Sequence, residues 1–538
     1  MTDLEQTDDG CTQGRRNGRL GTTGPGSARR ILTTSFFVVF ALSVLWSLAS
    51  PLMSVPDEPA HTIKAAAVAR GELLGQTDGE QGSAMTVTVP GYIAASHNQT
   101  CYKHQKQISA ACAQGVGEDT APVAAETTAG NYNPLYYFVT GLPSLFLTGA
   151  PAIYGMRIAS ALFCSVFFAM TFAAAAKFKR PLWPFAAAAI STTPMVLYLT
   201  GSINPNALEI AAAAAFFLNL CVVLGSSTLR SVRGNMAFVG LSGLVLANTR
   251  PLSLLWMALA AGAALCIYGW RPLLKVFKDG LGFAMTVLVG IGCGLSLAWF
   301  AVANSFESLT GTGVELSKAD AAIIMFERTL DYATGYVGRL GWLDTDLPVA
   351  IYILWYSLMA LLLIVGLTSR GWGNRSAVIL LVAGIVALPP VMQAQVINEL
   401  GWIWQGRYIL ALVVVLVLCC GVVGQSLVLH AAPRTRSVLR LLTGLLVLAH
   451  AFSFVFVLRR YSVGMIDEPN WGRFLLAPEW QPPLTWVGLS LIYAAAVALA
   501  GFVAYRYVMA TLAPSQTHDP GPGCPGPGTV EAPADSLT

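Results

Sequence analysis

The chain of 538 residues contains 55% hydrophobic and only 11% charged residues, and its mean hydropathy is +0.61. A soluble globular protein carries roughly 25% charged residues, so a water-soluble multidomain protein is excluded. The excess of apolar residues has to face lipid, which predicts an all-α integral membrane protein with many spans. The net charge of +4 is small, and the positions of the basic residues are more informative than their sum.

About twelve apolar stretches are long enough, or nearly long enough, to cross a bilayer, for which about 20 residues are needed. The stretch 236–249 is short and predicts a broken or half-buried helix. The predicted spans are 31–51, 153–176, 182–199, 206–224, 236–249, 251–270, 280–303, 347–367, 377–396, 408–429, 437–458 and 485–509.

One further apolar stretch, 134–150, is assigned by charge, because cytoplasmic loops are enriched in Lys and Arg. If it does not cross, every basic cluster falls on the cytoplasmic side; if it crosses, all later clusters face outward. We therefore predict that 134–150 is a juxtamembrane helix or hairpin and that both termini are cytoplasmic. The clusters consist of Arg15, Arg16, Arg19, Arg29 and Arg30, then Lys177, Lys179 and Arg180, Arg230 and Arg233, Arg271, Lys275 and Lys278, Arg370 and Arg375, and Arg434, Arg436 and Arg440.

This topology divides the chain into a transmembrane domain, 31–510, and two polar tails, 1–30 and 511–538, which predict disordered cytoplasmic segments. Four segments are predicted outside the cell membrane, and the first of them is the largest. They cover 52–152, 304–346, 459–484 and about 394–407.

Two cysteines lie close together in the first external segment. Cys101 and Cys112 are eleven residues apart. An oxidising exterior favours a disulfide between them, and two free thiols are the alternative.

A dense group of ionisable residues follows the first span: Pro56-Asp57-Glu58-Pro59-Ala60-His61. Asp57 or Glu58 can cap a short helix that has proline in its first turn. On that helix Asp57, His61 and Lys64 share one face. One interpretation is a capped interfacial helix whose charges face water. The other is a site in which a carboxylate acts as general base or holds a divalent cation.

Several other polar and aromatic residues are predicted on the same side of the membrane. Arg407 lies outside, against the trend of the basic residues, and its guanidinium suits a phosphate or carboxylate partner. Glu209 and Arg250 lie near the outer ends of spans, where the alternatives are capping or snorkelling. The remaining candidates for substrate contacts are Lys64, Tyr136, Arg339, Trp342, Asp344, Asp346, Trp404 and Tyr408.

The sequence contains no Walker-type phosphate loop, dinucleotide fingerprint, HExxH or CxxC motif. The sequence therefore gives no indication of a soluble nucleotide cofactor. Since the candidate residues lie on the outer face, where activated nucleotides are not supplied, a lipid-borne substrate is favoured.

Four motifs in this order resemble the bacterial membrane family called domain of unknown function 2142, over about residues 31–510. They are Pro56-Asp57-Glu58-Pro59-Ala60-His61, Asn133-Pro134-Leu135-Tyr136-Tyr137, Gly341-Trp342-Leu343-Asp344-Thr345 and Gln405-Gly406-Arg407-Tyr408. That family is similar to the GT-C glycosyltransferases, multi-pass enzymes that use polyprenyl-phosphate-linked sugars.

The resemblance implies a GT-C-like fold and a set of roles for this chain's residues. Asp57 and Glu58 correspond to the catalytic acidic pair of the first external loop, with His61 beside them. Glu209 stands where relatives carry an assisting carboxylate, so Asp57 and Glu209 are the candidates for holding Mg²⁺, Mn²⁺ or Ca²⁺. No basic residue occurs beside Asn131 and Asn133, which leaves Arg407, Arg250 or Arg339 for the donor phosphate.

The resulting hypothesis is an inverting transferase at the outer face of the cytoplasmic membrane. It moves a sugar from a polyprenyl-phosphate donor to a cell-envelope glycan, polysaccharide or glycolipid. The alternative is a lipid-linked saccharide transporter or flippase, which predicts charges on both sides of the midplane. The abundance of Arg, Ala and Gly suggests a GC-rich actinobacterium, for which arabinose or mannose donors would be suitable.

Overall fold

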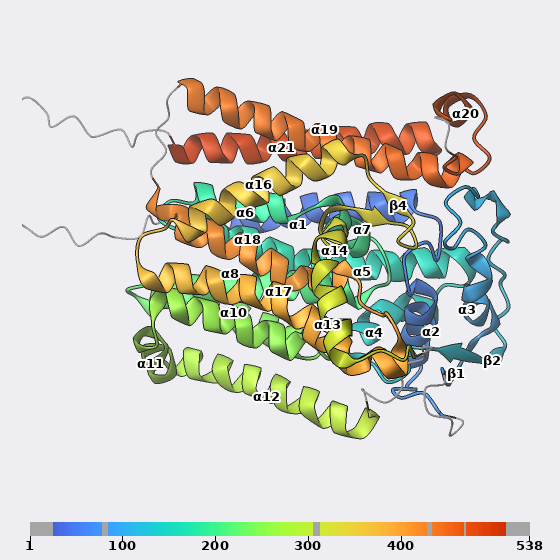
Figure 1. Cartoon of the computed structure of the whole chain (residues 1–538), viewed down its shortest axis with the longest axis horizontal. Helices are drawn as coiled ribbons and strands as arrows, with labels where there is room; N and C mark the ends of the chain where they lie inside the picture. Colours follow the sequence, from blue (N-terminus) through green and yellow to red (C-terminus); the bar gives the residue numbers. More distant parts are fainter. Residues whose placement is uncertain (1–24, 78–83, 305–312, 428–432, 467–469, 513–538) are drawn as a thin grey trace, which may run out of the picture.

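The computed structural model describes residues 25–77, 84–304, 313–427, 433–466 and 470–512. The predicted tails therefore lie almost entirely outside the described residues, although the first helix begins at Pro25, six residues before the predicted span. Long helices run side by side along the longest axis of the molecule (Figure 1). Their apolar residues form one continuous core in the interior of the bundle.

The long helices correspond closely to the predicted spans. A break at Thr192 and Thr193 divides one of them into α6 (Leu182–Ser191) and α7 (Pro194–Thr200), which meet at 65°. The others are α1 (Pro25–Ala49), α5 (Gly149–Ala175), α8 (Pro205–Leu224), α9 (Arg233–Ala247), α10 (Ser253–Tyr268), α12 (Gly280–Ala303), α16 (Val349–Leu367), α17 (Trp372–Leu400), α18 (Leu410–Val423), α19 (Pro433–Val463) and α21 (Trp486–Leu512).

Eight helices of the described chain are long and apolar enough to cross a membrane, or up to ten if each of two bent pairs counts as one span. The predicted number of about twelve is larger because α9 and α18 contain only 15 and 14 residues. Both are shorter than the roughly 20 residues that a straight crossing needs. The apolar stretch at 134–150 is not a continuous span, since α4 (Pro134–Gly141) and a 3-10 turn, Leu142–Leu145, precede α5.

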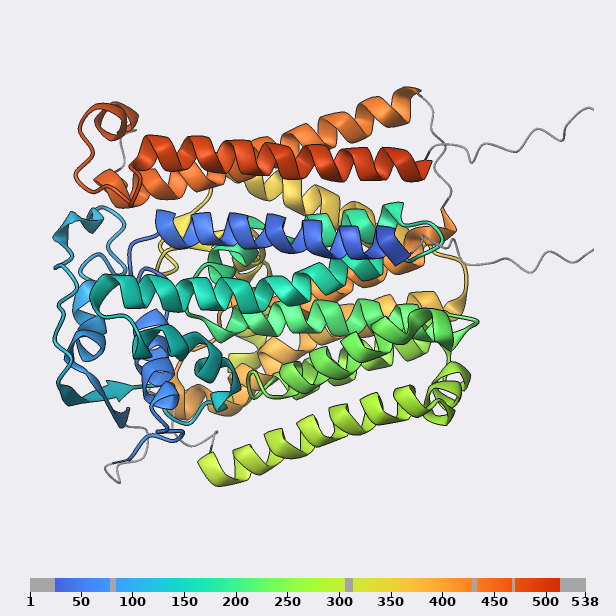
Figure 2. The ribbon, with the colours of Figure 1, turned by 180° about the vertical axis from the view of Figure 1, so that it is seen from behind.

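The two ends of the bundle differ in composition. Helix α1 begins and α21 ends at the same end (Figure 2). The basic clusters of the chain meet there: Lys177 donates to Asn235 over 2.6 Å, and Arg180 donates to the carbonyl of Gln425 over 3.0 Å. We call this the basic end. It also carries α11 (Arg271–Lys278), which bends away from α10 by 109°.

The opposite end carries most of the short elements (Figure 1). We call it the acidic-motif end, because it contains α2 (Glu58–Ala69). Strand β1 (Met85–Pro90) pairs antiparallel with β2 (Pro122–Thr127), and β3 (Arg339–Leu340) pairs with β4 (Thr345–Asp346). The remaining short helices are α3 (Gly91–Ala94), α13 (Lys318–Glu327), α14 (Thr329–Tyr332), α15 (Thr334–Val337) and α20 (Trp471–Leu476).

Candidate active site

Helix α2 is buried within the acidic-motif end and does not lie on its surface. Every residue from Glu58 to Val68 is buried, which rules out an interfacial helix with water-facing charges. The helix ends at Ala69, and Gly71 follows its last turn with φ +93°. The helix thus acts as an internal support for the residue that precedes it, Asp57.

Glu58 fixes the start of α2 through a buried ion pair. Its two carboxylate oxygens accept hydrogen bonds from Nε and Nη2 of Arg157 on α5, over 2.7 and 2.6 Å. Both side chains are 0% exposed. The backbone N–H groups of Ile203 and Val55 donate to the same carboxylate over 3.2 and 3.4 Å.

Arg157 is fully engaged as well. Its Nη atoms donate to the carbonyl oxygens of Ser47, Ser50 and Pro51, over 2.7–2.8 Å. These carbonyls belong to the frayed end of α1, which lacks partners within its own helix. The pair of Glu58 and Arg157 therefore joins α1, α2 and α5, and it leaves no lone pair of Glu58 facing solvent.

Asp57 occupies the N-cap position of α2 but does not cap it with its side chain. Its backbone is left-handed, with φ 66°, and no side-chain hydrogen bond to the helix is formed. A non-glycine residue in this conformation is strained, and such strain clusters at functional sites. The carboxylate turns away from the helix and pairs with Arg407. The predicted cap position is correct, and the predicted capping bond is absent.

The partners in this second ion pair differ in exposure. The side chain of Arg407 is 0% exposed, whereas that of Asp57 is 44% exposed. Arg407 also donates to the carbonyl oxygen of Pro56 over 3.0 Å. Burial by itself would raise the pKa of Asp57, but the charge and hydrogen bond of Arg407, together with His61 and Arg250, outweigh it, so this pKa lies below its usual value. Asp57 is thus an ionised and accessible carboxylate.

The turn that contains Arg407 packs tightly, backbone against backbone, on the segment around Tyr332 and Gly335. It is a 3-10 turn, Gly406–Tyr408. A Cβ atom on Gly406 would overlap the carbonyl oxygen of Tyr332, and one on Gly335 would approach the Cα of Gly406 to 3.1 Å. Helix α15 consequently rests directly on the backbone that presents Arg407, which explains why a glycine precedes this arginine.

His61 lies one turn after Asp57 and is neutral. Burial lowers the pKa of its imidazole to about 3, and the nearby charge of Asp57 opposes this effect only in part. The hydroxyl of Tyr137 on α4 lies 2.9 Å from Nδ1 of His61. His61 therefore lies in the cluster beside Asp57, with a neutral imidazole.

A third ion pair lies beside the second. Arg250 contacts Glu209 at 3.3 Å and also donates to Asn206. Ser253 donates to the other oxygen of Glu209 over 2.7 Å. The side chain of Arg250 is 11% exposed and that of Glu209 is 0% exposed. A charged group buried in this way is costly unless it is paired, and each of the two residues supplies the partner of the other.

The ring of Tyr408 joins the second and third ion pairs. The guanidinium carbon of Arg250 lies 5.1 Å from its centroid and that of Arg407 lies 5.4 Å from it. Within the described chain, Nε of each of these arginines is buried and has no hydrogen-bond partner. Asn204 connects the same region to the acidic motif by donating to Pro56 over 3.2 Å. Two cations thus converge on one aromatic residue next to Asp57.

The motif around Trp342 forms a neighbouring cluster. Trp342 donates from its indole to the carbonyl oxygen of Met53 over 3.1 Å, so the β3–β4 hairpin packs on the segment that leads to Asp57. Asp344 pairs with Arg460 at 3.1 Å. Arg339 and Asp346, 41% and 57% exposed, lie 3.6 Å apart at the hairpin surface. Arg339 is therefore placed with Asp346 and not with Arg250 and Arg407.

Three other candidate residues are held inside the protein. Lys64 donates to the carbonyl oxygens of Leu73 and Gly130 over 2.6 and 2.5 Å, and burial lowers its pKa to about 7. The hydroxyl of Tyr136 lies 2.8 Å from Ser160. Trp404 is buried and packs edge-on against Tyr408 at 5.9 Å. Lys64 and Tyr136 tie elements together, and Trp404 supports the ring between the arginines.

The carboxylates do not fit a divalent cation. A hard cation needs several oxygen ligands free of other partners. Asp57 and Glu209, the two predicted ligands, each pair with an arginine. No group of three His, Cys, Asp or Glu side chains suited to a metal occurs among the described residues.

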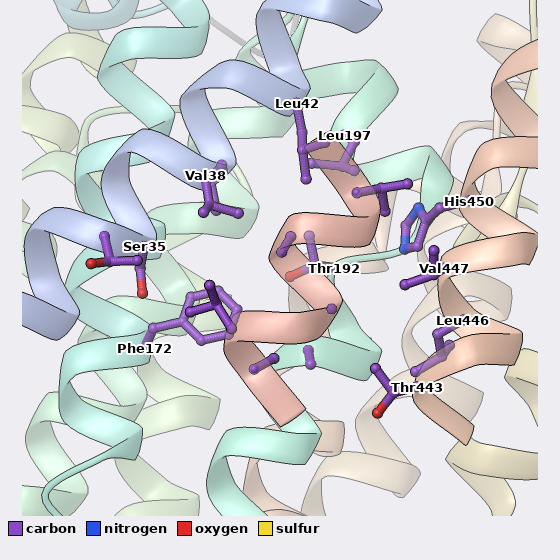
Figure 3. Close-up of a pocket in the computed structure, with 18 of the residues that line it drawn as sticks. Ser35, Val38, Leu42, Phe172, Thr192, Leu197, Thr443, Leu446, Val447 and His450 are labelled. Carbon is purple, nitrogen blue, oxygen red and sulfur yellow. The ribbon is translucent and has the colours of Figure 1, made fainter. Parts of the chain in front are cut away.

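A cavity of about 190 Å³ lies elsewhere, between α1, α5, α6, α7, α19 and α21 (Figure 3). It is mostly apolar, with His450 pointing toward it. One helical turn toward the acidic-motif end, Trp46 packs against Phe454 and donates to Tyr493 over 3.1 Å. This aromatic cluster separates the cavity from Asp57.

A disulfide and Arg460 hold the loop 101–112 in place. Cys101 and Cys112 form a disulfide, with Cα atoms 6.1 Å apart. Arg460 donates to the carbonyl oxygens of Tyr102, Gln105 and Ile108 over 2.6–3.2 Å. The loop 101–112 is therefore fastened to α19 and, through Asp344, to the β3–β4 hairpin.

Removing the side chain of Arg460 is expected to release this loop. Arg460→Met deletes three hydrogen bonds from a charged donor, each worth about 1.5–3 kcal/mol. Cleavage by trypsin at the exposed Lys103 and Lys106 should become at least about tenfold faster, because proteolysis follows the open population. The measurement is limited proteolysis followed by mass spectrometry. Arg506→Met, on α21 at the basic end, is the matched control, and equal cleavage rates in both variants would contradict the assignment.

Sequence reasoning missed Arg157, Arg460 and Tyr137. Arg157 is the one charged residue of α5, which reads as a span. An ionisable residue within a span is by default paired and functional, and that rule could have identified Arg157. Arg460 lies in the last turn of α19, beyond the predicted span 437–458, so the same rule does not reach it. No signal in the sequence indicates that Tyr137, and not Tyr136, faces His61.

These features define a class of protein: a multi-pass helical membrane protein with a cluster of buried ion pairs at one end of its bundle. The chain belongs to the family of predicted membrane proteins DUF2142, whose profile matches residues 40–416. No curated protein matches it. Among solved structures it is similar to ArnT from Cupriavidus metallidurans bound to undecaprenyl phosphate, at 12% identity and a TM-score of 0.41. That similarity covers 90% of this chain and 77% of that chain.

Proposed function

We propose that the protein is a membrane glycosyltransferase. It transfers a sugar from a polyprenyl-phosphate-linked donor to a hydroxyl of a cell-envelope glycan or glycolipid. The observation that carries the proposal is Asp57, an accessible and ionised carboxylate beside two buried arginines. A base and an anion-binding group in contact are what such a transfer requires.

The side of the membrane follows from charge. The basic end carries the clusters that mark cytoplasmic loops, and Asp57 lies at the opposite end. The acidic-motif end then faces outward, where the disulfide between Cys101 and Cys112 is chemically suited. We place the reaction at the outer face of the cytoplasmic membrane.

Asp57 acts as the general base. Its carboxylate accepts the proton of the acceptor hydroxyl as the hydroxyl oxygen attacks the anomeric carbon. The bond between that carbon and the phosphate oxygen breaks, and the electron pair leaves with polyprenyl phosphate. A direct displacement of this kind inverts the configuration at the anomeric carbon.

The leaving phosphate is stabilised by arginine. Nε–H of Arg250 and of Arg407 have no partner in the described chain, and a guanidinium binds phosphate through paired N–H groups. Both arginines hold a carboxylate, but the side chain of Arg250 is 11% exposed and that of Arg407 is 0% exposed, so Arg250 is the principal phosphate ligand. Tyr408 keeps the two cations at a fixed spacing.

Glu58 and His61 serve as positioning residues. Glu58 is saturated by Arg157 and two backbone N–H groups, so it holds α2 and does not touch substrate. His61 remains neutral and braces α4 through Tyr137. The predicted acidic pair is thus divided into one reactive and one supporting carboxylate.

The test is transfer of radiolabelled sugar from a polyprenyl-phosphate donor by the purified protein in liposomes. Polyprenyl phosphates that accumulate when the protein is removed from cells identify the donor to use. Turnover with inversion supports the proposal. Movement of the intact donor across the bilayer without cleavage would instead establish a lipid-linked saccharide transporter.

The rate of transfer should not change between about pH 5 and 6.5, below the pKa of Lys64, which is about 7. A carboxylate with a lowered pKa loses its base form only below its usual range, and His61, with a pKa of about 3, does not titrate in this window. We expect kcat/KM to be flat there, as measured with saturating lipid donor. A decline with a midpoint near 6.5 would show that a histidine, and not Asp57, provides the base.

A further inference from the structure

A cavity of about 210 Å³ lies in the basic end of the bundle, remote from Asp57. Helices α8, α9, α10 and α12 form its walls, and α11 lies across its end (Figure 1). Its lining is apolar except for Thr286, whose hydroxyl donates to the carbonyl oxygen of Gly282 over 2.9 Å. The lining therefore offers no free polar group.

An apolar cavity of this size is suited to hydrocarbon. Water needs two to four polar partners, and an engineered apolar cavity of about 150 Å³ stays dry and binds benzene. One wall, α12, faces lipid, because only 17% of its most apolar stretch is buried, whereas α8 on the opposite wall is fully buried. In a bilayer, the hydrocarbon next to α12 is an acyl chain of the adjoining leaflet.

Helix α11 supplies positive charge at the mouth of the cavity. Its inner side places Leu273 and Val276 on the cavity, while Arg271, Lys275 and Lys278 are exposed. It contains no acidic residue. The carboxylate of Asp279, which follows it, is engaged as the cap of α12 by the N–H groups at 281 and 282.

Two further features place α11 at headgroup depth. Trp270, Leu274 and Phe277 are exposed beside the basic residues, the composition of a helix that lies in the membrane interface. Helix α9 adds Arg233, one turn before Met236, which lines the cavity. Basic pockets between spans on this side of a membrane bind anionic lipid headgroups.

We propose that this cavity binds one anionic phospholipid. One acyl chain occupies the space between α8 and α12, and the phosphate contacts Lys275, Lys278 and Arg271. The basic residues of α11 bind the anionic headgroup, and the cavity binds an acyl chain. A free phosphate has no acyl chain, so it would make only the contacts with α11. This site is separate from Asp57 and stands whether or not the protein transfers a sugar.

The experiment is native mass spectrometry of the purified full-length protein from nanodiscs of phosphatidylcholine and phosphatidylglycerol. We expect one phosphatidylglycerol to survive delipidation. Lys275→Gln/Lys278→Gln should weaken its retention by about 30-fold, because each cation near a membrane surface contributes about one factor of five. Ala261→Phe, which fills the cavity and keeps every charge, should also abolish retention.

The matched control is Arg434→Gln/Arg436→Gln. It removes two positive charges from the same end of the bundle but from α19, on the far side from α11 (Figure 1), and it should retain the lipid. Thermal unfolding of each variant verifies the fold. Equal retention by the wild type and the α11 variant, or retention by Ala261→Phe, would overturn the proposal.

Discussion

Replacing Asp57 by asparagine is expected to lower the rate of sugar transfer by about 10²–10⁴-fold, the usual contribution of a general base. Asparagine keeps the size of the side chain and can still accept a hydrogen bond from Arg407, so the fold should persist. It cannot accept the proton of the acceptor hydroxyl. The measurement is single-turnover transfer from a polyprenyl-phosphate donor, with the thermal midpoint of unfolding determined in the same detergent.

The matched control is Asp346→Asn, which removes the same charge from the surface of the β3–β4 hairpin, where the side chain is 57% exposed. Its transfer rate should stay within about twofold of the wild type, as expected for an exposed ion pair. An Asp57→Asn protein that retains full turnover would refute the role of Asp57 as base. A loss of the thermal transition would instead point to a structural role, which Asp57→Glu would then test.

Replacing Arg157 by methionine should have the largest effect on stability. The substitution leaves the carboxylate of Glu58 buried and without its cation, and breaking a buried pair in this way costs about 3–5 kcal/mol. It also frees the carbonyls at the end of α1. We expect a marked fall in the thermal midpoint and in the yield of folded protein from detergent, measured by intrinsic fluorescence during heating.

A double variant separates charge from packing. Glu58→Gln/Arg157→Met contains no unpaired charge, so it should be more stable than Arg157→Met alone. Arg473→Met serves as the surface control, because Arg473 and its partner Glu479 are 52% and 36% exposed. If the double variant were no more stable than Arg157→Met, the ion pair would not be the reason that α2 is held in place.

The positions of the long helices could be predicted because they depend on local composition. Apolar stretches and basic loops are read residue by residue, and the helices α1 to α21 follow them closely. The exceptions are the short helices α9 and α18, with 15 and 14 residues; α18 is almost completely buried among its neighbours, so its length does not have to match the bilayer. The burial of α2 could not be predicted, since an alanine-rich helix with three ionisable residues reads as a surface element.

The candidate site was only partly predictable. Asp57, Arg407, Glu209 and Arg250 were identified as unusual charges, but which acid pairs with which arginine depends on distances of 41 to 350 positions along the chain. The prediction of Arg339 as a phosphate ligand is not supported by its place at the hairpin surface. The saturation of Glu58 depends on Arg157, whose significance is evident only once α5 lies beside α2.

The contact between Gly406 and Tyr332 has a mechanical consequence. Most side chains can rotate to absorb a small shift of their neighbours, but two backbones in contact cannot. Helix α15 and the turn that presents Arg407 must therefore move as one body, and Arg407 carries Asp57 with it through their ion pair. A displacement of the segment from Tyr332 to Val337, for example as a donor enters from the lipid, would therefore also move the carboxylate of Asp57.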